Sequence, residues 1–390
     1  MNQAISSAPP APPVQEPRWL DTAAEMDAWL AGHQDQSLAL DTEFERVSTF
    51  FPIPGLVQLG AGDSLRLAEP SVAEQSARFR EVLADAGRPK LLYAMGEDLE
   101  LFRHWLGLEP KGMLDLQLGA ALAGAGFSVG YARLVETLFG EILDKSATRS
   151  DWLARPLSPQ QQRYALDDVR FLDPLYRWVC ERLRARGLAG AMAEESDRFA
   201  SDLQALSEPA NWYLKLRGGW HLPAAKQAVL KALVVWREQE CRRRDRPRNR
   251  VLSDAALINI ADRLAERTGA LGAVPDVPPV VVRRYGDTLL DVILQARASG
   301  EVPDPLIDRP LTRPQQERYR RIKKCMTRAA AEADVPIELL APRKRLEALV
   351  REDRTGAEAL DLFASGWRGQ VLAPVLDEIR ALLEEYSEHD

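Results

Sequence analysis

Short apolar stretches alternate with helical repeats over the first half of the chain. Three stretches have the length and composition of strands and follow one another closely, as in a meander joined by turns: 38–44 (LALDTEF), 55–62 (GLVQLGAG) and 64–70 (SLRLAEP). A further run, KLLYAM at 90–95, precedes Leu99, Phe102 and Leu106, which share one face of a helix. Helices are also predicted at 22–31 and near 71–86. The pattern predicts an α/β domain with a mixed sheet.

A long helical segment closes this half. It opens with Ser158-Pro-Gln-Gln, in which Ser is the N-cap, Pro takes the first helical position and Gln the third. The segment is expected to kink near Pro174 and to stop at Gly187. We therefore place the α/β domain at residues 18–205, after a disordered leader at 1–17.

Beyond residue 205, amphipathic helical runs replace the strand signals. Two helical modules are expected, at 208–295 and 303–385, with a boundary in the proline-rich stretch 303–317. We expect residues 272–286 (GAVPDVPPVVVRRYG) to pack as a loop within the first module. A proline-led helix with a basic run recurs in each module, at a spacing that indicates duplicated domains, because solenoid repeats are much shorter.

Composition excludes several classes of protein. The chain has 390 residues, enough for two or three domains, and shows neither a secretory signal pattern nor an apolar run of the roughly 20 residues that span a bilayer. We therefore expect no membrane contact. The three cysteines are far apart and in no metal-ligand spacing. We therefore expect no zinc site, and we expect the protein to reside in a reducing cytoplasm.

Charge is spread unevenly along the chain. The net charge is −7, yet residues 211–250 hold eleven Lys or Arg and only three Asp or Glu. Such a segment suits an anion-binding surface, although charge runs are more often solvated faces.

Acidic residues at four positions attract attention. Asp41 and Glu43 follow an apolar run and point to the same face of a strand, where two like charges need a metal ion or solvent. Asp98 is expected near a helix N-terminus, and Asp168 lies one turn after Tyr164 on the same helix face. Taken singly, Asp98 could be a helix cap and Asp168 a solvated acid. Taken together, the four favour a site.

Three stretches around these acids carry a family resemblance. Asp41-Thr42-Glu43-Phe44, Glu97-Asp98-Leu99-Glu100 and the run from Tyr164 to Val169 resemble the exonuclease motifs of the DEDD superfamily, in the subclass with a tyrosine in the third motif. Residues 49–60 and 145–158 are similar to segments of the ribonuclease D family, and 236–257 resemble the helicase-and-ribonuclease-D C-terminal (HRDC) module. Departures occur at Tyr93, Gly96 and Asp115-Leu116-Gln117, where the family often has other residues. They put substrate contacts in doubt and leave the acids intact.

The resemblance implies a ribonuclease H-like exonuclease domain followed by two all-α HRDC domains. It also implies a 3′–5′ exoribonuclease that uses two divalent ions, Mg²⁺ or Mn²⁺, and releases nucleoside 5′-monophosphates. Asp41 would bridge both ions, Glu43 and Asp168 would complete the first site, and Asp98 would hold the second. Tyr164, with Glu43, would orient the attacking water. Asp167 points away on the helix and is left out.

Nucleic acid is the expected partner, and no obligate protein partner is implied. We expect RNA contacts from a basic cluster and from aromatic side chains near the acids: Arg242, Arg243, Arg244, Arg246, Arg248, Phe44 and Phe51. The arginines could instead form a solvated helix end. The expected substrates are structured RNAs, above all tRNA precursors. Two alternatives stay open, a 3′–5′ DNA exonuclease and a catalytically silent RNA-binding scaffold.

Overall fold

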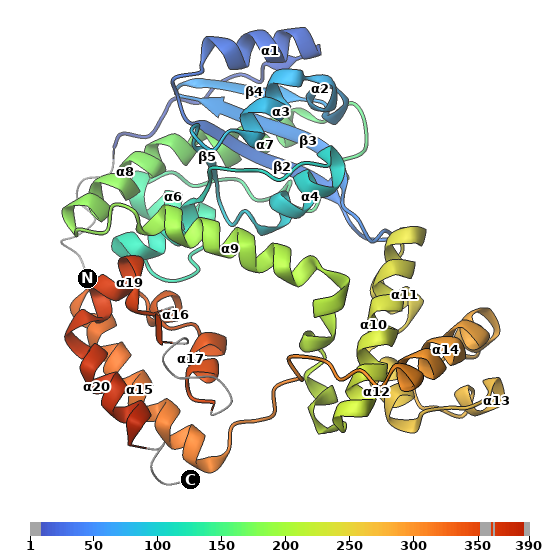
Figure 1. The fold of residues 1–390 in the computed structure, drawn as a ribbon. Helices are drawn as coiled ribbons and strands as arrows, with labels where there is room; N and C mark the ends of the chain where they lie inside the picture. Colours follow the sequence, from blue (N-terminus) through green and yellow to red (C-terminus); the bar gives the residue numbers. More distant parts are fainter. Residues whose placement is uncertain (1–8, 352–359, 362, 386–390) are drawn as a thin grey trace. The chain divides into compact units, whose positions relative to one another are not determined.

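Two compact units make up the chain in the computed structural model, which describes residues 9–351, 360–361 and 363–385 (Figure 1). The first unit comprises Met1–Glu45, Pro54–Ala200 and Leu311–Asp390 within the described ranges. The second comprises Arg46–Ile53 and Ser201–Pro310. Each unit is therefore built from segments that are distant in the sequence.

A six-stranded sheet organises the first unit, in the order β1-β4-β3-β2-β5-β6. Its strands are β1 (Trp19–Leu20), β2 (Leu38–Glu45), β3 (Ile53–Ala61), β4 (Ser64–Ala68), β5 (Lys90–Leu92) and β6 (Met113–Asp115). β3 and β4 are antiparallel, whereas β2 pairs with β5, and β5 with β6, in parallel. The sheet is therefore mixed, as the sequence predicts. The register Leu38↔Lys90 and Ala39↔Leu91 places the acidic end of β2 beyond its pairing with β5.

Helices surround the sheet. They are α1 (Ala23–Gly32), α2 (Pro70–Gln75), α3 (Ala77–Ala84), α4 (Gly96–Leu106), α5 (Leu116–Ala120), the π-helical turn η1 (Ala121–Ala125), α6 (Tyr131–Phe139), α7 (Pro159–Arg170), α8 (Leu172–Ala185) and α9 (Ala191–Ser207), whose last residues belong to the second unit. Two predicted helices are each split in two, the helix near 71–86 and the long helical segment that begins at Ser158. The helix expected near 71–86 breaks at Ser76, whose hydroxyl caps α3 by accepting from the N–H of Phe79.

The helices after residue 311 share the hydrophobic core of the first unit. They are α15 (Arg313–Glu332), α16 (Ile337–Leu340), α17 (Arg343–Leu349), α19 (Gly366–Leu372), η4 (Ala373–Val375) and α20 (Leu376–Glu384). One cluster of buried residues contains Leu116 and Trp178 together with Met326 and Trp367. Polar contacts add to this core, because Glu195 accepts from the indole Nε1 of Trp367 at 2.9 Å.

The described part of the second unit is mainly helical, and its main non-helical segments are the loop Arg46–Ile53 and the stretch 300–310 after its last helix. It contains the 3₁₀ turns η2 (Pro209–Lys215) and η3 (Arg217–His221), followed by α10 (Ala224–Arg244), α11 (Arg248–Val251), α12 (Asp254–Arg263), α13 (Thr268–Leu271) and α14 (Pro279–Ser299). The expectation of a loop over 272–286 is wrong in its second half, where α14 begins. Pro279 takes the first helical position, where its missing N–H costs no hydrogen bond.

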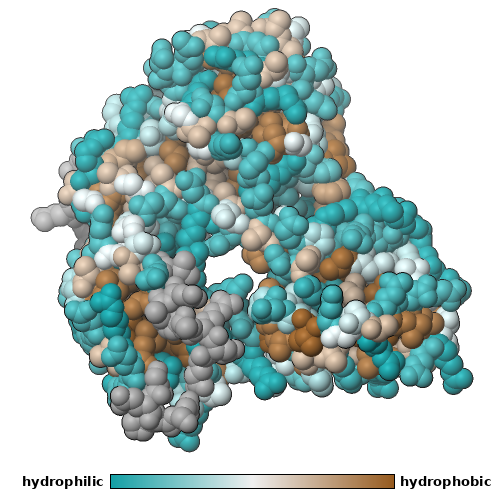
Figure 2. Space-filling model, viewed as in Figure 1, coloured by the Kyte–Doolittle hydropathy of each residue, from teal (hydrophilic) through white to brown (hydrophobic). Residues whose placement is uncertain are grey.

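Hydrophilic residues dominate the visible face of the molecule, and hydrophobic residues gather there in small patches (Figure 2). Across the described ranges, no helix has the length and apolar character to cross a membrane. Of the expected leader, residues 1–8 lie outside the described part. Residues 9–17 are described without helix or strand, and the Gln15 side chain donates to the Asp63 carbonyl at 2.6 Å.

Candidate active site

Carboxylates from two elements meet at the end of β2. Asp41 and Glu43 lie on this strand and Asp168 on α7, and one oxygen from each lies within 4.8 Å of the others. The strand places Asp41 and Glu43 on one face because side chains alternate along it. The capping box at Ser158 fixes the start of α7. The structure thus brings together three of the four acids that the sequence singles out.

Burial and mutual repulsion disfavour ionisation of these acids. Burial raises the pKa of Asp41 well above its usual range, and the charges of Asp168, Asp98 and Glu43 raise it further. Burial raises the pKa of Glu43 to about 9, with additional contributions from Asp168 and Asp98. The pKa of Asp168 rises to about 8, again mainly through burial. Clustered carboxylates that resist ionisation fit a divalent cation, because its charge offsets both their repulsion and their lost hydration.

Asp98 lies close to this group without joining it. It is the third residue of α4, it is 7% exposed, and its Oδ1 accepts a hydrogen bond from the hydroxyl of Thr42. Burial raises its pKa to about 7, and the Thr42 hydrogen bond opposes the rise. Thr42 lies between the two strand acids, and the sequence analysis gave it no role in the site. It links β2 to α4.

Tyr164 stands one turn before Asp168 on α7. A hydrogen bond from Tyr164 lowers the pKa of Asp168 and partly opposes the effect of burial. Burial, followed by the charge of Asp168, raises the pKa of Tyr164, so its phenol keeps its proton. Its ring packs 5.9 Å from the Trp152 ring, centroid to centroid. Tyr164 is therefore a fixed donor beside the acids.

Asp115 positions the start of α4 and was not predicted to do so. Its carboxylate accepts the backbone N–H groups of Ala94 at 3.0 Å and Met95 at 3.1 Å, just before α4. Ala94 has a left-handed φ of 59°, a conformation that needs such support in a residue with a Cβ. The acid at the end of β6 was the available signal, and the sequence analysis treated it only as part of a departure from a family pattern.

Tyr131 is a second residue that the sequence analysis missed. Its hydroxyl donates to the Asp167 carbonyl at 2.8 Å and accepts from the N–H of Phe171 at 3.3 Å. These bonds hold the end of α7 just beyond Asp168. No local spacing signals a tyrosine 36 residues from its partner.

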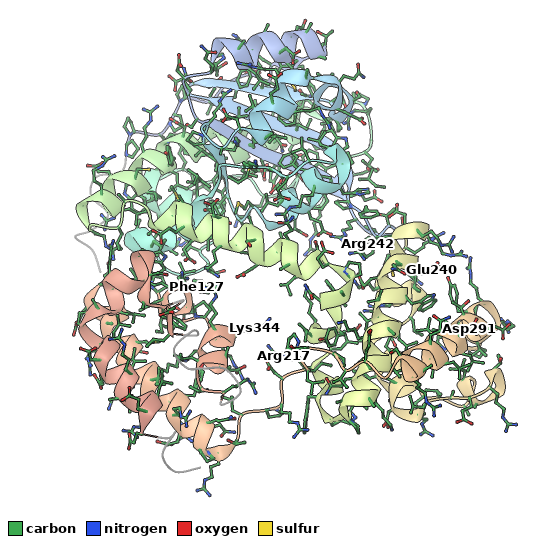
Figure 3. All side chains as sticks on the ribbon, viewed as in Figure 1. Phe127, Arg217, Glu240, Arg242, Asp291 and Lys344 are labelled. Atoms are coloured by element: carbon green, nitrogen blue, oxygen red, sulfur yellow. The ribbon has the colours of Figure 1, made fainter. Side chains whose placement is uncertain are left out.

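Most of the predicted RNA-binding arginines already have acidic partners in the second unit. Arg242 and Arg248 bind Glu238 at 2.8 and 2.7 Å, and Arg243 binds Glu240 at 2.8 Å. Arg244 also pairs with Glu240. Figure 3 labels Glu240 and Arg242 on α10. The charge available for an anion is therefore smaller than the sequence count indicates.

The remaining predicted contacts have mixed surroundings. Arg246 lies in the turn after α10, where its N–H donates to the Cys241 carbonyl at 3.0 Å. The Arg243 side chain is 64% exposed. Phe51 is partly buried against a small cluster in the second unit, and Phe44 is half-buried on β2.

Two stretches of this chain match known protein families. Residues 17–183 match the family described as 3′–5′ exonuclease, and residues 226–293 match the HRDC domain. The fold and the site thus define a 3′–5′ exonuclease that carries an HRDC domain.

Relatives narrow the class. The chain is 37% identical to ribonuclease D of Pseudomonas paraeruginosa, with 87% of this chain and 92% of that protein covered. It is 31% identical to ribonuclease D of Escherichia coli, with 90% of this chain and 93% of that protein covered. The crystal structure of Escherichia coli RNase D, described as an exoribonuclease involved in structured RNA processing, superposes with a TM-score of 0.82 at 29% identity and covers 95% of this chain and 100% of that one. The chain belongs to the ribonuclease D family and is a 3′–5′ exoribonuclease, a hydrolase of ester bonds.

Proposed function

We propose that this exoribonuclease trims the 3′ ends of tRNA precursors and other structured RNAs with two divalent ions, Mg²⁺ or Mn²⁺, and releases nucleoside 5′-monophosphates. The observation that carries the proposal is the meeting of Asp41, Glu43 and Asp168 within 4.8 Å, with raised pKa values. Hard carboxylate oxygens are the ligands that these ions prefer.

The acids and Tyr164 would divide the work at the scissile phosphate. Asp41, Glu43 and Asp168 would bind one ion, and Asp98 with Asp41 the other. Bound ions of this kind lower the pKa of water and stabilise charge on the attacking and leaving oxygens. The protonated phenol of Tyr164, beside Asp168 and close to the charge of Glu43, is suited to orient the attacking water. Thr42 would hold Asp98 in place.

Support for structured RNA comes from outside the acidic cluster. The Escherichia coli relative is described as acting in structured RNA processing. An RNA contact role for Arg242, Arg243, Arg244, Arg246, Arg248, Phe44 and Phe51 remains a proposal, and the exposed Arg243 is best placed for it. The domain limits 18–205, 208–295 and 303–385, the second HRDC domain and the absence of an obligate protein partner also remain proposals. A cytoplasmic location agrees with the three cysteines, which are all free.

A direct test compares Asp41→Asn with wild type on end-labelled tRNA precursor, single-stranded RNA and single-stranded DNA, with and without chelator. Losing several kcal/mol of charge stabilisation should lower the rate by about 100-fold or more, because each 1.4 kcal/mol is worth about tenfold. Asp167→Asn is the matched control. Its carboxylate pairs with Arg170 at 3.0 Å, so we expect nearly unchanged activity.

Each alternative has its own outcome in this test. Faster cleavage of DNA than of RNA would favour the DNA exonuclease. RNA binding without any cleavage would favour the silent scaffold. Asp41→Asn that degrades RNA as fast as Asp167→Asn would rule out the proposed metal ligands.

A further inference from the structure

The loop that follows the acid-bearing strand belongs to the second unit. β2 ends at Glu45, two residues after Glu43, and the next residues, Arg46–Ile53, are part of the compact unit that contains α10 and α11. β3 then begins at Ile53 and returns the chain to the sheet. Only Phe44 and Glu45 separate a proposed metal ligand from a segment that the helical unit holds.

Asp245 holds the backbone of this loop. It ends α10 in a left-handed conformation with φ 48°, and its Oδ1 accepts the N–H groups of both Phe50 and Phe51 at 2.9 Å. Hydrogen bonds to a charged acceptor are about twice as strong as those between neutral groups. A single carboxylate therefore fixes two successive peptide units.

The Phe50 side chain is also buried and in contact with neighbouring side chains. It is 4% exposed, and the guanidinium carbons of Arg242 and Arg248 lie 4.8 and 4.7 Å from the ring centroid. Both arginines are in turn bound to Glu238, whose side chain is fully buried. The Phe50 carbonyl accepts from Arg46 Nε at 2.8 Å. Arg242 and Arg248, from which the sequence analysis expected RNA contacts, thus pack against the Phe50 ring.

We infer that Asp245 and Phe50 are positioning residues for hydrolysis. Through them, the first helical module (208–295) fixes the end of β2 and, with it, Glu43. The inference rests on the proposed role of Glu43 as a metal ligand. Catalytic groups tolerate little displacement, since a shift of about 1 Å can cost up to 100-fold in rate. This contact would then affect the chemical step itself and not only the binding of RNA.

Three variants separate the effect of losing the Asp245 hydrogen bonds from any effect on the left-handed end of α10. Asp245→Gly removes the acceptor while improving the left-handed conformation, which glycine adopts without strain. Asp245→Asn keeps an oxygen acceptor and a residue type that tolerates positive φ. Asp276→Gly is the matched control, because it makes the same change at φ 62° in the same unit and loses only an exposed bond from Asn259.

Two readouts are needed, using the full chain, a short single-stranded RNA and Mn²⁺ titrations. Amide hydrogen exchange of the peptide containing Phe50 and Phe51 should speed up in Asp245→Gly and not in Asp276→Gly. In the same variant we expect kcat to fall about tenfold, KM to stay within about twofold, and half-maximal activity to need more Mn²⁺. Asp245→Asn should recover most of the kcat.

Some outcomes would overturn the inference. If exchange speeds up while kcat and the Mn²⁺ requirement match those of Asp276→Gly, the loop has no bearing on chemistry. If Asp245→Gly does not fold, Phe50→Leu takes its place with the same readouts, because leucine stays apolar but lacks the ring that the two arginines contact. Wild type that fails to cleave the short RNA with Mn²⁺ would contradict the proposed function instead.

Discussion

Tyr164 meets the acids as a neutral phenol, since its own pKa is raised by burial and by Asp168. Replacing it with Phe keeps the ring packed against Trp152 and removes only the hydroxyl. Orienting a water molecule contributes less than binding a metal ion, so we expect Tyr164→Phe to slow RNA cleavage by roughly 10- to 100-fold. Single-turnover assays at saturating Mn²⁺ would measure this. A loss as large as that of Asp41→Asn, with a lowered melting temperature, would show that Tyr164 is mainly structural.

The acids also make stability depend on pH. The folded pKa values of Glu43 and Asp168, about 9 and about 8, lie above their ordinary values of 4.5 and 3.8. Raised carboxylate pKa values mean that the folded state holds protons that the unfolded state has released. The stability that these two groups contribute is therefore fully present below about pH 4. It is progressively lost as the pH rises towards 9.

Asp41→Asn removes one of the repelling charges. Without metal, we expect it to melt several degrees above wild type at pH 9 and at a similar temperature at pH 5. Adding Mn²⁺ at pH 9 should raise the melting temperature of wild type more than that of the variant. Thermal melts at both pH values with chelator or Mn²⁺ would decide. Parallel curves for the two proteins would mean that Asp41 carries no unfavourable charge.

At the scale of elements, Thr42 joins β2 to α4 through its bond to Asp98. Thr42→Val keeps the branched shape that suits a strand and removes the donor, which should raise the pKa of Asp98 above about 7. Protons would then compete better with metal ions at neutral pH. We expect cleavage at pH 7 to fall roughly 3- to 10-fold and to recover at higher pH or higher Mn²⁺. Thr42→Ser, which keeps the hydroxyl, should resemble wild type across the pH profile.

Elements with a clear period were predictable from sequence, and short ones were not. β2 was expected at 38–44 and spans Leu38–Glu45, because an apolar run leads into alternating positions. β1 and β6 contain two and three residues, too few to show any period. The helix expected to kink at Pro174 instead breaks at Phe171, and Pro174 lies in the first turn of α8, where its missing N–H does no harm.

The candidate site shows the same limit. Strand alternation placed Asp41 and Glu43 together, and a four-residue helical spacing placed Tyr164 with Asp168. The pairing of Arg242 with Glu238, also four residues apart, could have been read from the same rule. The contact of Phe50 with Asp245 could not, because 195 residues separate the two.

At the scale of the molecule, the last helices complete the first unit. Trp367 is 2% exposed and packs in the shared core. Its indole Nε1 donates to Glu195, and its backbone N–H donates to Glu194 at 3.0 Å. We expect Trp367→Ala to lower the free energy of unfolding by about 3–5 kcal/mol. Denaturant titration would measure it, with Trp220→Ala as the control, since that ring is 39% exposed. Equal losses in both variants would mean that the C-terminal helices add little to the core.

The loop held by Asp245 has a consequence for synthesis. The ribosome makes Phe50 long before Asp245, and at about 5–20 residues per second the 195 intervening residues take roughly 10–40 s. The strand with Asp41 and Glu43 thus emerges early, but its following loop can be fastened only after α10 has been made. If this loop positions Glu43 as inferred, a nascent chain completes its active site only after α10 has left the ribosome.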